Sequence, residues 1–480
     1  MALANGYSVL RTITLDHTKF ASTLTDFTVA LTVTTPALKL IANGGYVTDA
    51  QADDVILTSD VAGTTLLSWE VESYDGTAGT IVVHLKIASA SHVTDPVVYM
   101  FIGKSGVTTF QSTATDAWKS AYVAVYHLAE TGTNPTVLDS TSNNNDSASQ
   151  LWTPTTAGKI GPCGTFVAAS NNGANLGTPA TLNALQVPLT ISGWFYPTTA
   201  TGYITIFAQY KAPTNHQLIK IVRLDSGALT YYLSKADGTF QSFSFAGANP
   251  TQDAWNYFAV RVGGSAATPT LAITLNGSTE TFSPAALSTT PDTTVTCQLG
   301  NSEASPASEG WSGKLDAIRI ANADLGADWI ASEYANGNSP STFYTVTGGG
   351  SIKTVITGVA HAAYDTTTNL PLKAEVSSAY DGHKVYDWTT AAWVDLSSYD
   401  DAADWTTNAL VDMHEVVFGD GAGTGHYVQT FPDAVLHVPW KIAYYDDEVV
   451  VRDAPCEVQV GQSLADLCKT DPSAALAYMR

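Results

Sequence analysis

Two glutamates in the run WEVES, Glu70 and Glu72, have the spacing in this sequence that best suits acid–base chemistry. On a strand their side chains would face the same side of a sheet, about 6.5–7 Å apart by rise. A retaining glycosidase needs two carboxyl groups about 5–5.5 Å apart, and an inverting one about 6.5–9.5 Å. Tyr74 stands where an alternating row of acids would continue. We predict that the pair is not catalytic and keep a glycan hydrolase as an alternative.

A polar loop, LDSTSNNNDSAS, has the composition of a metal site. It brings Asp139, Asn143, Asn145 and Asp146 together, and Ca²⁺ prefers oxygen ligands from Asp, Asn and backbone carbonyls. The glycine and the distal glutamate of an EF-hand loop are missing. Two interpretations stay open: a calcium site, or an Asx-rich turn whose side chains bond to nearby backbone.

A carboxylate interrupts an apolar strand pattern between residues 310 and 337. The run GWSGKLDAIRIANADLGADWIASEYANG predicts a strand followed by an amphipathic helix that covers a sandwich. Asp316 shares strand parity with Ile318 and Ile320, so its side chain should point where apolar side chains point. Burying a carboxylate alone is costly, so we expect Asp316 to be paired or metal-bound. Gly337 is expected to end the helix.

Aromatic residues offer a second kind of candidate site. Trp388, Trp393 and Trp405 lie in the least regular region of the sequence, and aromatic faces can stack on sugar rings. We therefore predict that these three form a ligand-binding surface. The histidines of the same region show no i, i+2 or i, i+4 pair, and the chain has no nucleophile elbow, phosphate loop or dinucleotide-binding glycine motif.

Composition limits the classes of partner. The chain has 480 residues, of which 45% are hydrophobic and 14% charged, and its net charge is −23. Nucleic-acid binding rests on clustered Lys and Arg, and the sequence has no basic run, so we expect no nucleic acid partner. No window approaches the ~18 apolar residues of a membrane helix, so we expect no membrane insertion. The start, MALANGYSVLRT, lacks the pattern of a signal peptide, which predicts a cytosolically made protein.

The elements that must position these residues are strands. Short runs rich in Val, Ile, Thr, Tyr and Phe, broken by Gly, Asn, Asp and Pro, predict an all-β protein made of several β-sandwiches or jelly rolls. We place three domains at 1–115, 116–346 and 347–480. The second boundary falls beside the glycine run in TVTGGGSIK, which has the composition of a flexible linker.

The four cysteines leave the redox state open. Cys163 and Cys297 would share the central domain, and Cys456 and Cys468 the last one. Two intradomain disulfides are therefore possible. Reduced, mostly buried thiols are the interpretation we favour for a cytosolically made chain.

The N-terminal region resembles a known but uncharacterised domain of bacterial and phage proteins. The matching runs are GYSVLRTITLDHTKF, LTDFTVALTV, WEVESYDGTAGTIVVHLKI and DPVVYMFIGKSG, which cover most of residues 6–106. That domain usually precedes a laminin-G-like domain, and its function is unknown. The resemblance implies a β-rich fold and accounts for the acidic pair without catalysis.

The middle region resembles a laminin-G-like (concanavalin A-like) jelly roll over nearly all of 120–345. The runs VYHLAETGTNPTVLDSTSNNNDSAS, LTISGWFYPT, DAWNYFAVRV and LAITLNGS carry the resemblance. It implies a buried Trp194 on an inner strand, and it implies that the polar loop lies near the closing strand, often around a calcium ion. The calcium ligands predicted on this basis are Asp139, Asn143, Asn145 and Asp316.

The C-terminal run GHYVQTFPDAVLHVPWKIAYYDDE resembles a small β module of phage structural proteins. The three regions together resemble a tailed-bacteriophage virion protein. This implies a non-enzymatic decoration, collar, fibre or tail-associated subunit, assembled in the host cytoplasm into the virion. It also implies a homo-oligomer whose partners are other virion proteins and whose jelly roll contacts host glycans or neighbouring subunits. A bacterial carbohydrate-binding surface adhesin, which would need export, stays as an alternative.

Overall fold

The computed structural model describes most of the first 348 residues and, beyond them, the backbone of seven strands. The ranges described within the first part are 5–168, 172–199, 202, 204–211, 215–223, 226–289, 295–302 and 309–348. The later strands form two small antiparallel sheets, in the orders β24-β23-β29 and β26-β25-β27-β28. Their bounds are β23 (Ile352–Ala360), β24 (Leu372–Glu375), β25 (Lys384–Asp387), β26 (Ala392–Asp395), β27 (Glu415–Gly419), β28 (Tyr427–Thr430) and β29 (Val438–Tyr445).

The N-terminal region is a sandwich of two antiparallel sheets, in the orders β22-β1-β6-β3 and β2-β5-β4. Alternating apolar residues on these strands face each other and form its core. The strand bounds are β1 (Val9–Leu15), β2 (Leu24–Thr34), β3 (Val55–Thr58), β4 (Ser68–Asp75), β5 (Thr80–Ala90), β6 (Val97–Ile102) and β22 (Tyr344–Gly348). We call this unit the N-terminal sandwich.

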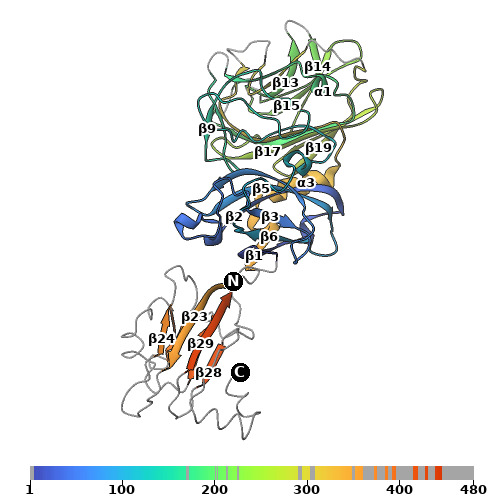
Figure 1. The fold of residues 1–480 in the computed structure, drawn as a ribbon. Coiled ribbons are helices and arrows are strands. Elements are labelled where there is room, and N and C mark those ends of the chain that lie inside the picture. The colour runs from blue at the N-terminus through green and yellow to red at the C-terminus, as the bar shows by residue number, and fades with distance from the viewer. Residues whose placement is uncertain are drawn as a thin grey trace.

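The central region is a jelly roll of two larger sheets. The near sheet, which packs on the N-terminal sandwich, has the order β19-β18-β17-β12-β21-β10-β9, with β7 beside β21; the far sheet has the order β16-β15-β14-β13-β20-β11-β8 (Figure 1). The bounds are β7 (Tyr122–Tyr126), β8 (Ser149–Leu151), β9 (Thr153–Thr155), β10 (Cys163–Phe166), β11 (Gly173–Gly177), β12 (Leu189–Pro197), β13 (Ile204–Lys211), β14 (Asn215–Arg223), β15 (Leu229–Ser234), β16 (Phe240–Ser244), β17 (Asn256–Gly264), β18 (Pro269–Leu275), β19 (Ser278–Phe282), β20 (Thr296–Leu299) and β21 (Gly313–Ala321). The predicted all-β class with a central jelly roll is confirmed.

Helices are few and short in the described part of the chain. None of the helices there is long and apolar enough to cross a membrane. Their bounds are η1 (His17–Lys19), η2 (Pro36–Leu38), η3 (Ile41–Asn43), η4 (Ala114–Ala117), α1 (Ala180–Asn183), α3 (Ala327–Asn338) and α4 (Pro340–Phe343).

The closing strand β21 contains an irregularity that the sequence pattern hid. In its register against β12, Asp316 lies opposite Trp194 and Arg319 lies opposite Ser192. Asp316 and Arg319 are three positions apart in β21, whereas Ser192 and Trp194 are only two positions apart in β12, so β21 carries one extra residue. Ala317, within the shift, has a left-handed φ of 50°. Such a bulge adds one residue to a strand and moves everything beyond it to the opposite face.

The bulge overturns the predicted direction of Asp316. Ile318 and Ile320 belong to the apolar core of the jelly roll, as expected. Asp316 points the other way, because it pairs with Trp194, whose ring belongs to the core shared with the N-terminal sandwich. The carboxylate is thus directed into the contact between the two units and not into the jelly-roll interior.

Helix α3 lies where the near sheet meets the N-terminal sandwich (Figure 1). The Asn336 side chain bonds both backbone groups of Ala30 on β2, accepting from the N–H at 2.8 Å and donating to the carbonyl at 3.0 Å. The Trp329 ring packs edge-on against Phe27 of the same strand, with centroids 4.9 Å apart. The helix therefore joins the two units, whereas the sequence suggested a cover for the jelly roll alone.

Gly337 does not end this helix as predicted. The helix runs on to Asn338 and its C-cap is Ser339. A Cβ at Gly337 would lie 2.8 Å from the indole of Trp194, so the glycine lets the helix approach that ring closely.

The chain returns to its starting unit after the jelly roll. Strand β22 pairs with β1 along five residue pairs, from Leu15 opposite Tyr344 to Arg11 opposite Gly348. The boundary placed between 346 and 347 therefore falls inside a strand of the N-terminal sandwich. Because the sandwich holds both ends of the jelly-roll segment, the two units are tied by chain connections as well as by packing.

Cys163 on β10 and Cys297 on β20 are both buried and free. They lie in different sheets of the jelly roll and form no disulfide with each other. Cys456 and Cys468 lie outside the described residues.

Candidate functional site

A buried group of charged side chains fills the contact between the N-terminal sandwich and the near sheet. We call this contact the joint and the group the joint cluster. It consists of four carboxylate side chains, two imidazoles and one guanidinium: Glu70, Glu72, Asp316, Glu333, His84, His127 and Arg319. Charged groups rarely enter a protein interior unless they are paired or bind a metal. The joint cluster is therefore the strongest candidate site in the described part of the chain.

Glu70, on β4, is held by three donors from beyond its own sheet. Its carboxylate accepts bonds from Trp118 Nε1 at 2.8 Å and Ser140 Oγ at 2.7 Å, and it lies 3.3 Å from His127 Nε2. Burial alone would raise the pKa of Glu70, but the charge of His127 and these hydrogen bonds bring it below the usual value. Glu70 is therefore an ionised anchor at physiological pH.

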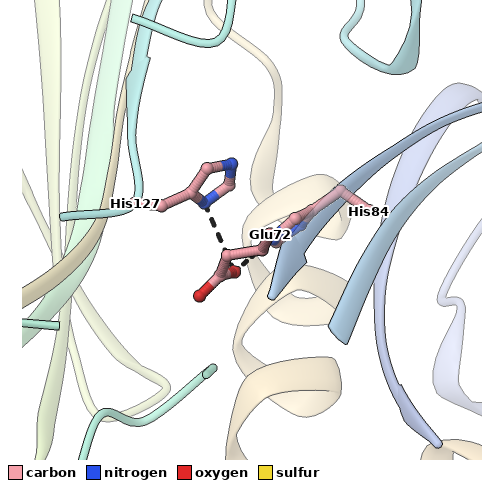
Figure 2. Close-up of side chains that lie close together, drawn as sticks. All are labelled: Glu72, His84 and His127. Atoms are coloured by element: carbon pink, nitrogen blue, oxygen red, sulfur yellow. Dashed lines mark hydrogen bonds and ion pairs between the residues drawn. The ribbon is translucent and has the colours of Figure 1, made fainter. Parts of the chain in front are cut away.

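Glu72 lies at the centre of the cluster. The register of β4 against β5 shifts between Val71 and Ser73, so Glu72 occupies a bulge. Its Oε2 lies 2.6 Å from His84 Nε2 on β5 and 3.5 Å from His127 Nδ1, which follows β7 of the jelly roll (Figure 2). The contact thus joins one side chain to imidazoles from both units.

Burial sets the protonation of this central group. Burial and the nearby charges of Asp316 and Glu70 raise the pKa of Glu72 well above its usual value. Burial and the positive charges of His127 and Arg319 hold the pKa of His84 well below its usual value. Desolvation disfavours the charged form of both groups. His84 is therefore neutral at physiological pH, and the Glu72 carboxyl retains a proton more readily than an exposed glutamate.

Asp316 approaches the same region from the near sheet. Its Oδ2 accepts the backbone N–H groups of Lys159 at 2.6 Å and Ile160 at 2.9 Å. Burial raises its pKa to about 8, although these hydrogen bonds act in the opposite direction. The turn that supplies them also passes over Glu72, since a Cβ at Gly161 would lie 2.2 Å from Glu72 Oε1.

The pKa of Asp316 predicts how stability depends on pH. The folded protein holds this proton up to about pH 8, while the unfolded carboxyl releases it near 3.8. The stabilisation is present below the unfolded pKa and is lost as pH rises through the folded pKa. We expect Asp316→Asn to remove this share of the pH dependence, so that denaturation curves measured across this window show a shallower fall than in the parent. Equal slopes in the two proteins would contradict the expectation.

Glu333, on α3, completes the cluster. Its Oε2 lies 3.1 Å from Arg319 NH1, and its Oε1 accepts from Ser192 Oγ at 2.5 Å and Tyr257 OH at 3.0 Å. The Tyr122 hydroxyl donates to Oε2 at 3.4 Å. One carboxylate of helix α3 thereby contacts side chains from four strands of the near sheet, namely β7, β12, β17 and β21.

The position of the acidic pair bears on the hydrolase alternative. The two side chains share a face, as predicted, because both reach His127. The Glu72 side chain is 0% exposed and that of Glu70 is 14% exposed. The Glu72 carboxylate is thus enclosed between the two units, and the Glu70 carboxylate is largely covered.

The predicted calcium ligands of the polar loop bond to protein groups. The carboxylate of Asp139 accepts from four donors: the backbone N–H groups of Val125, Thr141 and Asn145, and the Thr141 hydroxyl. The amide groups of Asn143 and Asn145 each donate to the carbonyl of Val123. This is the hydrogen-bonded turn that the sequence allowed as the alternative.

Asp316 is tied to a different loop from the one expected. Its side chain accepts hydrogen bonds from Lys159 and Ile160, and not from Asp139 or its neighbours in the described part of the chain. The structure therefore does not bring the four predicted ligands together through hydrogen bonds, and the tie between the closing strand and the polar loop is corrected to one with the 158–161 turn. Calcium binding stays a prediction.

The predicted aromatic surface falls outside the described side chains. Trp388 and Trp405 lie outside the described residues, and only the backbone of Trp393, on β26, is described. Sequence reasoning also missed His84 and His127, because they lie on different units and no short spacing connects them. His84 lies within β5 and His127 directly after β7, and the sequence carries no signal that these two segments meet.

The comparisons agree with the jelly roll. Residues 169–331 match the family model of the concanavalin A-like lectin/glucanases superfamily. The chain contains a concanavalin A-like domain. The comparison with curated proteins gives no match.

Solved structures of low identity resemble parts of the chain. The CBM40 module of the Ruminococcus gnavus IT-sialidase, bound to α2,3-sialyllactose, is 16% identical, with a TM-score of 0.29, covering 35% of this chain and 94% of that one. Domain 4 of AbnA, a GH43 extracellular arabinanase from Geobacillus stearothermophilus in complex with arabinotriose, is 16% identical, with a TM-score of 0.31, covering 45% and 98%. The binding domain of Paraclostridial Mosquitocidal Protein 1 is 10% identical, with a TM-score of 0.37, covering 75% and 96%.

The far sheet of the concanavalin A-like domain carries a second candidate surface. Phe240 is 51% exposed and is the exposed aromatic residue among the described side chains. Its ring lies 5.5 Å from that of Tyr232 on the neighbouring strand. Tyr232 pairs with Lys220, whose ammonium lies 2.6 Å from Glu309. Lys220 is buried and paired with Glu309, so we restrict the far-sheet patch to Phe240 and Tyr232, whose aromatic faces can stack on sugar rings.

Proposed function

We propose that this chain is a non-enzymatic structural protein of a tailed-bacteriophage particle, whose concanavalin A-like domain contacts host glycans or neighbouring subunits. The observation that carries the proposal is the division of the domain's two faces. The near sheet is covered by the N-terminal sandwich, and the far sheet lies on the opposite side of the domain (Figure 1). The far sheet carries the far-sheet patch of Phe240 and Tyr232. This arrangement supports a binding domain that the N-terminal sandwich holds in place.

Two further observations support a structural role. The acidic pair is buried in the joint and bonded to neighbouring side chains, an arrangement suited to holding two units together. The resemblance of all three regions to a virion protein supports the particle. The chain's excess of acidic residues suits a protein displayed at high local concentration, since net charge opposes aggregation.

Mass spectrometry of purified phage particles tests the particle assignment. We expect peptides of this chain in particles that have been banded and washed. Particles without it would contradict the virion role, and glycan binding by the same chain would then favour the surface adhesin.

The far-sheet patch gives a prediction for glycan contact. We expect the full chain to bind a subset of a host-glycan array, and Phe240→Ala to weaken that binding about tenfold, because aromatic anchors often contribute more than 1 kcal/mol at an interface. Leu138→Ala is the control, since Leu138 is also exposed on the same domain but lies outside the patch. Absence of binding by the parent, or equal loss in both variants, would contradict glycan contact through this patch.

A further inference from the structure

The joint cluster brings one carboxylate and two imidazoles, from both units, close enough together to hold a metal ion. One carboxylate oxygen of Glu72 and one nitrogen each of His84 and His127 all lie within 4.8 Å of one another (Figure 2). We propose that these three residues bind one divalent transition-metal ion, with Zn²⁺ as the reference ion, and that the ion crosslinks the N-terminal sandwich to the concanavalin A-like domain.

The distances suit such an ion after a small adjustment. Zn²⁺ is held at about 2.0–2.2 Å by His nitrogen and carboxylate oxygen, which places neighbouring tetrahedral ligand atoms about 3.3 Å apart. Glu72 Oε2 lies 3.5 Å from His127 Nδ1 and 2.6 Å from His84 Nε2. The shorter contact must therefore open by less than about 1 Å.

One imidazole must also turn. The His84 and His127 rings stack with centroids 4.2 Å apart and planes inclined by 23°, whereas a bound ion lies in the plane of each ligating ring. His127 is the ring that can move, because its contacts to Glu70 and Glu72 are long, at 3.3 and 3.5 Å, while His84 is held at 2.6 Å.

The surroundings of His127 match those of a metal ligand. A ligating histidine almost always donates its other ring N–H to a carboxylate, carbonyl or water, which fixes its tautomer. His127 Nε2 faces the Glu70 carboxylate, and Glu70 is itself fixed by Trp118 and Ser140. With Nε2 protonated, the lone pair of Nδ1 is directed to the Glu72 side.

Unpartnered buried atoms provide an independent observation. Glu72 Oε1, His84 Nδ1 and His127 Nδ1 are buried and lack hydrogen-bond partners among the described residues. Buried polar atoms are nearly always paired. His127 Nδ1 is the one of these three atoms that lies 3.5 Å from Glu72 Oε2, and a cation between the two would satisfy its lone pair.

The charge of the joint also favours a cation. Four carboxylates meet there, and Arg319 is paired with one of them, Glu333, at 3.1 Å. The Lys159 ammonium lies over the Trp194 ring, 4.7 Å from its centroid. A divalent ion beside Glu72 would compensate the negative charge of the Glu72 carboxylate. Two imidazoles with one carboxylate select Zn²⁺ and similar first-row ions over Ca²⁺ and Mg²⁺, which prefer oxygen ligands alone.

Metal content of the full chain is the direct test. We expect protein purified without chelator and supplied with Zn²⁺ to retain about one equivalent by elemental mass spectrometry, as a buried structural site does. Chelator treatment should lower its melting temperature, and Zn²⁺ should restore it. Co²⁺ should replace the ion and give the visible absorption of a site with nitrogen ligands. A parent protein that retains no ion and whose melting temperature does not respond to Zn²⁺ or chelator would overturn the proposal.

Variants locate the site. Glu72→Gln and His127→Gln keep similar shape, and each should reduce the retained metal from one equivalent to a small fraction and abolish the Co²⁺ absorption. His92→Gln is the matched control, because His92 is exposed on the same sandwich and contacts Thr23 instead of the cluster. Equal metal retention in all variants would refute these ligands even if the parent binds an ion. The readout is independent of particle assembly and of glycan binding.

Discussion

Glu333→Ala should lower the free energy of unfolding by about 3–5 kcal/mol, the usual cost of breaking a buried ion pair from one side. The substitution leaves the Arg319 guanidinium, which is also buried, without its carboxylate. It also removes the acceptor of the Tyr257 hydroxyl and of Ser192. Each buried donor that loses its acceptor adds a desolvation cost of about 1–3 kcal/mol to the loss of stability. Chemical denaturation of the parent and the variant measures the difference.

Two further variants make this result specific. Glu280→Ala is the matched control, because the Glu280 carboxylate bonds only to the exposed backbone of Ala246 and Gly247, and it should cost about 1 kcal/mol or less. Glu333→Gln retains an acceptor for the hydroxyls but loses the charge opposite Arg319, so it should lie between the two. A loss below about 1 kcal/mol in Glu333→Ala would contradict the prediction, because it would mean that the Glu333 hydrogen bonds and ion pair contribute little to the stability of the joint.

The large expected effect follows from where α3 lies. A helix that covered only the jelly roll would unfold that unit alone when weakened. Here Asn336 bonds to Ala30 of the N-terminal sandwich, and Glu333 bonds to the near sheet of the concanavalin A-like domain. One turn of helix therefore contacts both units, and the substitution should lower a single cooperative transition of the described part of the chain.

The fold was predictable because its signals are local. Short runs of strand-forming residues recur along the chain and predict strands from neighbouring residues alone. The Asn276–Gly277 pair predicts the hairpin between β18 and β19 in the same way. The direction of Asp316 was not predictable from parity alone, because one bulge residue reverses the face of all that follows. Gly193, opposite the bulge, was the available signal: a glycine within a strand marks a bulge or a close approach, and here Ile318 occupies the place of its side chain.

The candidate site was predictable only in part. The acidic pair on β4 was found because its residues are close in sequence and share a face. Their partners were not predicted, because the imidazoles that meet them come from β5 and from the segment after β7. The polar loop was found for the same reason of proximity, yet its oxygens bond within the loop and to β7. Residue types near in sequence indicate possible ligands, and the packing of separate units decides which of them meet.

Gly161→Ala should lower the free energy of unfolding by about 3 kcal/mol, although it adds a single methyl group. Gly161 has a left-handed φ of 73°, which costs a residue with a Cβ about 1–2 kcal/mol. The added Cβ would also lie 2.2 Å from Glu72 Oε1, and displacing a fully buried carboxylate from its imidazole partners adds about 1–3 kcal/mol of overpacking strain.

Gly238→Ala separates these two contributions. Gly238 belongs to the same domain and has a similar φ of 81°, but a Cβ there would meet nothing within 4 Å. It should therefore show the backbone cost of about 1–2 kcal/mol alone, and the excess measured at Gly161 by denaturation reports the close approach to Glu72. If the two substitutions lower the free energy of unfolding equally, the close approach of Gly161 to the Glu72 carboxylate makes no contribution to stability, which contradicts the prediction. If Gly161→Ala costs more, the 158–161 turn fixes both Asp316, through its N–H groups, and Glu72, through its lack of a side chain, and so positions the two carboxylates that face each other across the joint.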